Sequence, residues 1–262
     1  GLGALQTALA GRPWAMPFLS NAEDAQLALP FAREGRLWGI DQEFVGTTAI
    51  LLDALAERTR DAATRALLTA WRDSDRDLLH AGQFGDVSLS HDDAARYADL
   101  RRRFAADPAA LEIVDALAES ARIYALNATG QYLQSNEQRS QLMQLYFLTA
   151  YRTAPGPAPH VLFKMGAFHL GRGTTATGIV DLGSLLPGLA AANRLRYVNV
   201  AYVPMGGRVR SFHPTPEALT AVSPYDDESI KQIFDAAGIS IDSIPATGHV
   251  LIPLAPLRHN LQ

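Results

Sequence analysis

The chain has 262 residues, of which 48% are hydrophobic and 19% are charged, so it is long enough to bury a large core. Its formal net charge of −4 gives no electrostatic reason to expect a nucleic-acid partner, and the lack of cysteine excludes disulfides, thiolate catalysis and cysteine metal sites. No apolar run approaches the ~20 residues of a transmembrane helix. Residues 1–10 also lack the basic segment and apolar core of an intact signal peptide. Both the cytoplasm and the periplasm are compatible with this composition.

The first quarter of the chain predicts a helix, a strand and a second helix. Asn21 precedes two acidic residues, which is typical of a helix start, and Gly35 marks the end of that helix. Residues 36–40 form a short apolar strand that runs into an acidic turn, and residues 45–60 have helical spacing. This strand–turn–helix order is the usual opening of an α/β layer.

Residues 61–154 predict helices and no strand. The apolar spacing and the capping residues indicate four helices, over residues 62–79, 90–104, 109–127 and 136–150. We therefore expect one α/β domain over residues 1–262, with a mainly helical insertion at about 61–154.

The second half of the chain alternates strand and helix patterns again. A linker with three prolines and a glycine, residues 153–159, leads into a short apolar run that predicts a buried strand. The remaining elements are a helix over 180–193, a strand over 197–203, a loop over 205–225, a helix over 226–237 and an edge strand over 249–254. The predicted fold class is α/β, with a mostly parallel sheet core, flanking helices and a helical insertion.

A histidine follows the apolar run that begins at Val161. The run contains Lys164, one of only two lysines in the chain, and breaks at Gly166 before reaching His169 and then Arg172. A lysine in a buried strand needs an acidic partner or a function. Strand ends are where α/β folds bind ligands, and glycine leaves room for close approach, so Gly166 and Arg172 are candidate substrate-binding residues. His169 is a candidate base or ligand, or alternatively a loop histidine that caps a carbonyl.

The acidic turn after the first predicted strand is a second candidate. Asp41 and Glu43 are two residues apart, which suits general acid–base work or ligand binding. The alternative is structural, with Asp41 capping the following helix and Glu43 in its first turn.

An arginine on a predicted helix is the third candidate. Arg139 and Met143 are four residues apart and share a helix face. An arginine on a partly apolar face needs a carboxylate partner, for which Asp41 or Glu43 is suitable; alternatively, it is an ordinary exposed charge at a helix start.

The order of these motifs resembles the erythromycin esterase-like and ChaN-like superfamily, with its TraB/Tiki relatives. That superfamily has an acidic motif after its first core strand, an arginine in a helical insertion, and an apolar strand that ends in G-x-x-H. The corresponding pieces here are residues 39–43, Arg139 and residues 166–169, within a resemblance that covers about residues 36–202. Glu43 stands where the superfamily usually has a histidine. The resemblance implies a parallel-sheet α/β fold, and hydrolysis, metal-dependent proteolysis or haem binding as the activity.

The leading hypothesis from the sequence is a hydrolase, esterase-like or metal-dependent, acting on a small-molecule, ester or peptide substrate. Glu43 or His169 would activate water, Asp41 would orient His169, and Arg139 and Lys164 would hold the acids or stabilise negative charge. The alternatives are a haem- or metal-binding carrier without turnover and a catalytically degenerate member. No cofactor and no metal ligand set is assigned from the sequence.

Overall fold

The computed structural model describes residues 2–202 except 13, 18 and 20. Beyond residue 202 it describes 204, 207–213, 215, 218, 220–225, 231, 234–235, 238–240, 243–244, 251 and 253. The chain divides into two compact units. Unit 1 comprises residues 1–200 and 213–219, and unit 2 comprises residues 201–212 and 220–262.

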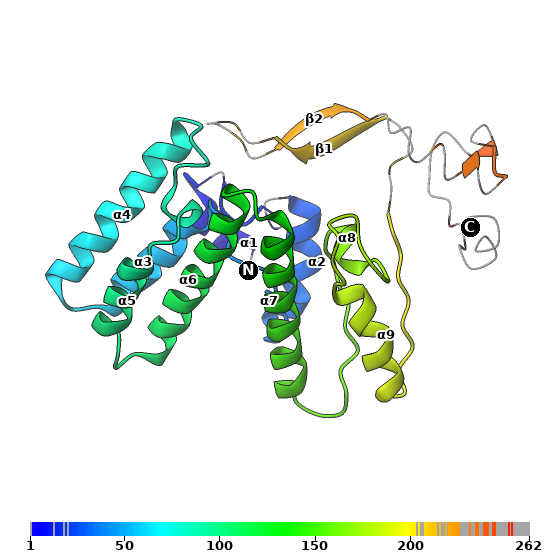
Figure 1. Cartoon of the computed structure of the whole chain (residues 1–262), viewed down its shortest axis with the longest axis horizontal. Helices are drawn as coiled ribbons and strands as arrows, with labels where there is room; N and C mark the ends of the chain where they lie inside the picture. The colour runs from blue at the N-terminus through cyan, green and yellow to red at the C-terminus, as the bar shows by residue number, and fades with distance from the viewer. Residues whose placement is uncertain are drawn as a thin grey trace. The chain divides into compact units, whose positions relative to one another are not determined.

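The described part of unit 1 is built from helices (Figure 1). They are α1 (Leu2–Leu9), α2 (Ala22–Arg33), α3 (Thr48–Arg58), α4 (Ala62–His80), the short 3-10 helix η1 (Ser88–Ser90), α5 (Ala94–Arg103), α6 (Pro108–Ala128), α7 (Tyr132–Thr153), α8 (Ala167–Leu170) and α9 (Leu182–Ala192). The helices predicted between residues 61 and 154 are confirmed, although α7 begins four residues earlier than expected.

Aspartate caps explain where three of these helices begin. Asp61, Asp93 and Asp107 each accept a hydrogen bond from the backbone N–H three residues later, at the start of α4, α5 and α6. Pro108 then occupies the first position of α6, where its missing N–H costs no hydrogen bond.

Helices α3 to α6 enclose the first apolar core of unit 1. Five leucines of these four helices are at most 1% exposed: Leu52, Leu55, Leu68, Leu100 and Leu117. Leu52 and Leu55 are three residues apart on α3 and therefore share its buried face.

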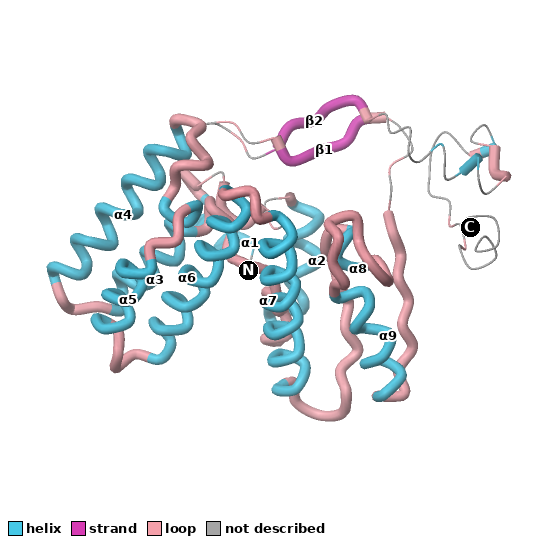
Figure 2. Tube along the Cα trace, in the orientation of Figure 1, coloured by secondary structure: helices cyan, strands magenta, loops and turns pink. Residues whose placement is uncertain are grey.

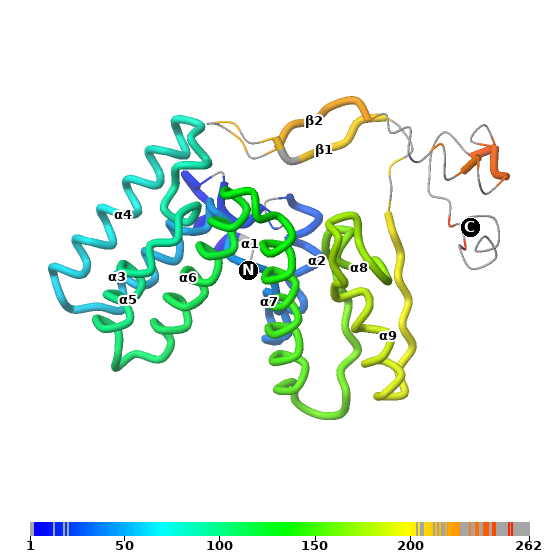
Figure 3. The backbone as a smooth tube through the Cα atoms, in the orientation of Figure 1, coloured from blue at the N-terminus to red at the C-terminus, as the bar shows by residue number. Residues whose placement is uncertain are grey.

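A second, smaller core lies between α7 and α9. Its buried members are Met143 and Phe147 from α7 and Leu182 and Leu186 from α9. Three extended segments, at residues 36–40, 161–165 and 195–200, add partly buried side chains to it. Figure 3 traces the last two of these segments before and after the α8–α9 region.

The predicted parallel sheet is wrong. Residues 36–40, 161–165 and 197–202 have no strand pairing, and the described residues form one sheet, a two-stranded antiparallel one (Figure 2). In two of these segments alternate side chains are partly buried, because Trp38, Ile40, Phe163 and Met165 turn towards the second core while Gly39 and Lys164 between them are exposed. Alternating burial shows that one side of an extended segment is covered. Here helices cover that side, and no strand in the described part of the chain pairs with the segment.

The described sheet belongs to unit 2. Strand β1 (Arg208–Phe212) pairs antiparallel with β2 (Thr220–Pro224), in a register that matches Arg208 with Pro224 and Phe212 with Thr220. The prediction of a loop over residues 205–225 is therefore wrong, since prolines and glycines flank these strands and obscured them. The strand predicted over 249–254 and the helix predicted over 226–237 lie mostly outside the described residues.

Candidate functional site

Helix α7 brings together two acidic residues that are far apart in the sequence. Arg139 holds Asp41 through two hydrogen bonds, one of them 2.8 Å from Nε to Oδ1 and the other from Nη2 to Oδ2. This is a bidentate, charge-assisted pair, and its hydrogen bonds raise the pKa of the arginine. The expectation that Arg139 pairs with one of the acids of the first turn is confirmed.

The next residue of α7 contacts a second acid. The Ser140 hydroxyl donates to Oδ1 of Asp181 at 2.8 Å, and Oδ2 of Asp181 lies 2.7 Å from Nδ1 of His169. Asp181 also caps α9, where its Oδ1 accepts the N–H of Leu182. The side chain of Asp181 is 2% exposed and that of His169 is 20% exposed. The histidine is therefore held by a buried carboxylate while one edge of its ring reaches solvent.

Gln144, Ser140, Asp181 and His169 form a series of hydrogen bonds, and the donor in each bond can be assigned starting from Gln144. Nε2 of Gln144 donates to the Ser140 hydroxyl at 3.1 Å, since an amide nitrogen has no acceptor role. The Ser140 proton therefore points to Asp181. Burial would raise the pKa of Asp181, but hydrogen bonds from His169, Leu182 and Ser140 outweigh burial and lower the pKa. With Nδ1 bonded to the Asp181 carboxylate, Nε2 is the ring nitrogen that remains available to a ligand.

Two glycines lie where α8, which carries His169, packs against the start of α9. A Cβ atom at Gly183 would lie 2.1 Å from the carbonyl oxygen of Leu170 and 2.3 Å from that of Gly171. Only glycine lets the histidine-bearing segment approach the start of α9 this closely. A Cβ atom at Gly166 would lie 3.5 Å from Cδ2 of His169, the ring atom next to Nε2. A side chain at position 166 would therefore be in ordinary van der Waals contact with this edge of the ring, and the role of Gly166 in substrate binding stays a prediction.

Glu43 lies beside the Arg139–Asp41 pair. Burial and the negative charge of Asp41 raise the pKa of the Glu43 carboxyl. Its backbone N–H donates to the Ser120 hydroxyl of α6 at 2.8 Å. His169 is bonded to Asp181 and not to Asp41 or Glu43, so the proposed orientation of His169 by Asp41 is wrong.

The two remaining predicted cations have different surroundings. Lys164 pairs with Asp24 of α2 at 2.9 Å and its side chain is 52% exposed, so the expected pairing with Asp41 or Glu43 is wrong. The reason is that residues 161–165 are not a buried strand and Lys164 lies on their exposed side. Arg172 is exposed, and none of the acids in the described part of the chain lies within 4 Å of it.

Sequence reasoning missed Asp181, Ser140 and Gln144. Asp181 had a detectable signal, because it immediately precedes a predicted helix, but an N-cap aspartate is usually structural. Ser140 and Gln144 are four residues apart on a helix, and nothing in that spacing identifies a polar face directed inwards.

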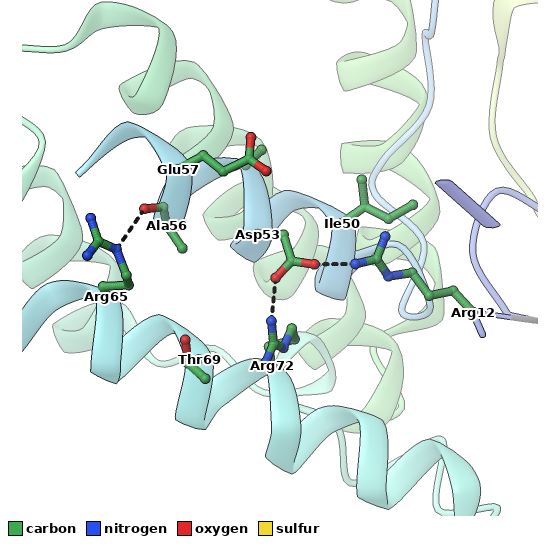
Figure 4. Close-up of a pocket in the computed structure, with 9 residues that line it drawn as sticks. Arg12, Ile50, Asp53, Ala56, Glu57, Arg65, Thr69 and Arg72 are labelled. Atoms are coloured by element: carbon green, nitrogen blue, oxygen red, sulfur yellow. Dashed lines mark hydrogen bonds and ion pairs between the residues drawn. The ribbon is translucent and has the colours of Figure 1, made fainter. Parts of the chain in front are cut away.

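A separate cavity of about 530 Å³ lies between α3 and α4 (Figure 4). Asp53 sits in it between Arg12 and Arg72, and Arg65 is bonded to backbone oxygens. The carboxylate of Asp53 is already bound by both guanidinium groups. We therefore interpret this cavity as an ion-paired groove between two helices.

No family model, curated protein or solved structure matches this chain. Among the described residues, no three acidic or histidine side chains are placed to share a metal ion. The described helices also include none with the length and apolar character needed to cross a bilayer.

Proposed function

We propose that the chain is a hydrolase in which His169, held by Asp181, activates water to cleave an ester. One observation carries this proposal. A buried carboxylate lies 2.7 Å from Nδ1 of a histidine whose side chain is 20% exposed and whose Nε2 has no hydrogen-bond partner among the described residues. This arrangement orients a general base and stabilises the imidazolium that forms when the base takes a proton.

The reaction requires one proton to move twice. Nε2 of His169 removes a proton from water while the water oxygen bonds to the ester carbonyl carbon. The tetrahedral intermediate then breaks the carbon–oxygen bond to the alcohol, and Nε2–H returns the proton to the departing alkoxide. The products are a carboxylic acid and an alcohol, and the Asp181 carboxylate stays ionised throughout.

The other predicted residues support this reaction in two ways. Gly166 leaves space beside the Cδ2–Nε2 edge of the ring for the water and the carbonyl. Arg172 provides the positive charge of the loop that follows His169, which favours the negative charge that develops on the carbonyl oxygen. Both described side-chain hydrogen bonds of Arg139 go to Asp41, so Arg139 positions that acid. The motif order resembles a superfamily that includes ester hydrolases and proteases, which supports a hydrolase, and the substrate panel described below decides between ester and peptide.

The test is hydrolysis of an ester and peptide panel by the wild type, His169→Ala and Asp181→Asn, with and without divalent metal. Loss of the base or of its carboxylate should lower kcat/KM for the best ester by about 100-fold or more. His91→Ala is the matched control, because His91 is also exposed but belongs to the first core region. Its activity should equal that of the wild type.

Two outcomes would overturn the proposal. Ester hydrolysis that survives both site substitutions would show that another group is the base. A chain that hydrolyses nothing but binds haem, with an absorbance shift that His169→Ala removes, would be a carrier instead.

A further inference from the structure

Three large apolar side chains on the segments that carry the proposed dyad and on the start of α7 are exposed to solvent. Phe168 and Val180, the residues immediately before His169 and Asp181, are 62% and 60% exposed. Leu133, in the first turn of α7, is 47% exposed. Scattered exposed apolar residues are common, but a group beside a reactive histidine is typical of a binding surface.

The loop between the dyad residues is held in place and brings these side chains into one region. Thr174 and Val180 form an antiparallel bridge, and the Thr175 N–H donates to the Ile179 carbonyl at 2.8 Å. A Cβ atom at Gly178 would lie 3.5 Å from Cδ1 of Leu133. The loop therefore contacts the start of α7, and Leu133 belongs to the same surface as the loop.

The charges of this surface restrict what can bind it. Residues 167–180 contain no acidic side chain, and Arg172 is their only arginine or lysine. A cationic group would find no partner on this loop, whereas an uncharged hydrocarbon chain would cover exposed apolar surface.

We propose that the preferred substrates are esters of apolar carboxylic acids, with the acyl chain lying on Phe168, Val180 and Leu133. This inference rests on the proposed function, because it places the acyl chain beside the histidine that activates water. The free energy gained by covering this surface distinguishes a long acyl chain from a short one.

The test is kcat/KM for p-nitrophenyl esters from acetate to octanoate, each below its micelle concentration. The wild type should gain about twofold per methylene, the gain expected when roughly half of each added group leaves water. Phe168→Ser and Leu133→Ser should reduce that gain. Leu67→Ser is the matched control, because Leu67 is a 40% exposed leucine on α4, and it should keep the wild-type gain.

The outcomes separate this inference from the proposed function. A rate that depends on His169 but not on acyl length would overturn the inference and leave the hydrolase proposal standing. A gain with acyl length that persists in both Phe168→Ser and Leu133→Ser would also overturn it. Ester hydrolysis that is independent of His169 would overturn the proposed function itself. Circular dichroism of each variant shows whether it is folded.

Discussion

The region of α3 to α6 and the region of α7 to α9 are stabilised in different ways. The first encloses a large apolar core, and several of its ion pairs join residues three or four apart, such as Arg102 and Arg103 with Asp99. The second has a smaller core, and its main polar contacts span 98 residues between Arg139 and Asp41 and 41 residues between Ser140 and Asp181. The first region is stabilised mainly by burial of apolar surface. The second has a smaller apolar core and depends more on the polar contacts that α7 makes with distant segments.

Loss of a leucine from the first core should have the largest effect on stability. Leu68→Ala removes a fully buried side chain and should lower the free energy of unfolding by about 2–5 kcal/mol. Activity per folded molecule should stay at the wild-type value below the melting temperature. Chemical denaturation measures the free energy of unfolding, and an ester-hydrolysis assay normalised to the folded fraction measures the activity per folded molecule. A variant that loses activity while still folded would show that the two regions are coupled.

Gly183→Ala, in the second region, should affect activity more than stability, the opposite of what is expected for Leu68→Ala. Gly183→Ala places a Cβ atom 2.1 Å from a carbonyl oxygen of the α8 segment, so this segment must shift away from Asp181. We expect a cost of about 1–3 kcal/mol in unfolding free energy and a much larger relative loss of activity. Gly188→Ala is the control in the same helix, because a Cβ atom there meets nothing within 4 Å and alanine favours helix. Equal behaviour of the two variants would contradict the packing described at Gly183.

The Arg139–Asp41 pair can be measured by a double-mutant cycle. Each side chain is about one-third exposed, so we expect a coupling free energy of about 1–2 kcal/mol between Arg139→Gln and Asp41→Asn. The double variant should lose less unfolding free energy than the sum of the losses of the two single variants, because each single variant already loses the whole interaction. Thermal unfolding of the four proteins gives the coupling, and a value near zero would show that the pair is dispensable.

The smallest expected effect is that of Glu43. Its pKa is raised by burial and by Asp41, so its ionisation disfavours the folded state, and stability is lost as pH rises through the folded pKa. Glu43→Gln should therefore be more stable than the wild type at pH 7, by less than about 1 kcal/mol. The difference should narrow as the pH falls towards and below 4.5, the ordinary value for this group. A variant that is less stable at pH 7 would show that the carboxylate has a favourable partner.

Most of the longer helices were predictable because they have a local signal, whereas α1 and the four-residue α8 were not predicted. Apolar spacing defined α4 and α6, and aspartates at their starts fixed the boundaries. The sheet was not predictable in this way. The apolar runs at residues 36–40 and 161–165 correctly indicated extended segments, but strand pairing depends on neighbouring segments that an apolar run does not specify.

The residues of the candidate site were predicted in part. Arg139 and Asp41 were connected because a partly buried guanidinium needs a carboxylate, and the argument holds at any separation in sequence. His169 was identified from its glycine-rich surroundings, but its partner was not. Asp181 is both the cap of α9 and the hydrogen-bond partner of His169. The sequence indicates only the first role, because an aspartate before a helix is usually a cap.

The carboxamide of Gln144 at the far end of the hydrogen-bonded chain has a consequence for turnover. An amide neither releases nor accepts a proton near neutral pH, so the chain from Gln144 to His169 orients groups but offers no exit to bulk solvent. A proton taken by Nε2 can leave only from the exposed edge of the imidazole. In the proposed reaction these hydrogen bonds therefore orient the imidazole without carrying its proton away, and the proton returns to the alcohol oxygen on the same side of the ring as the attacking water.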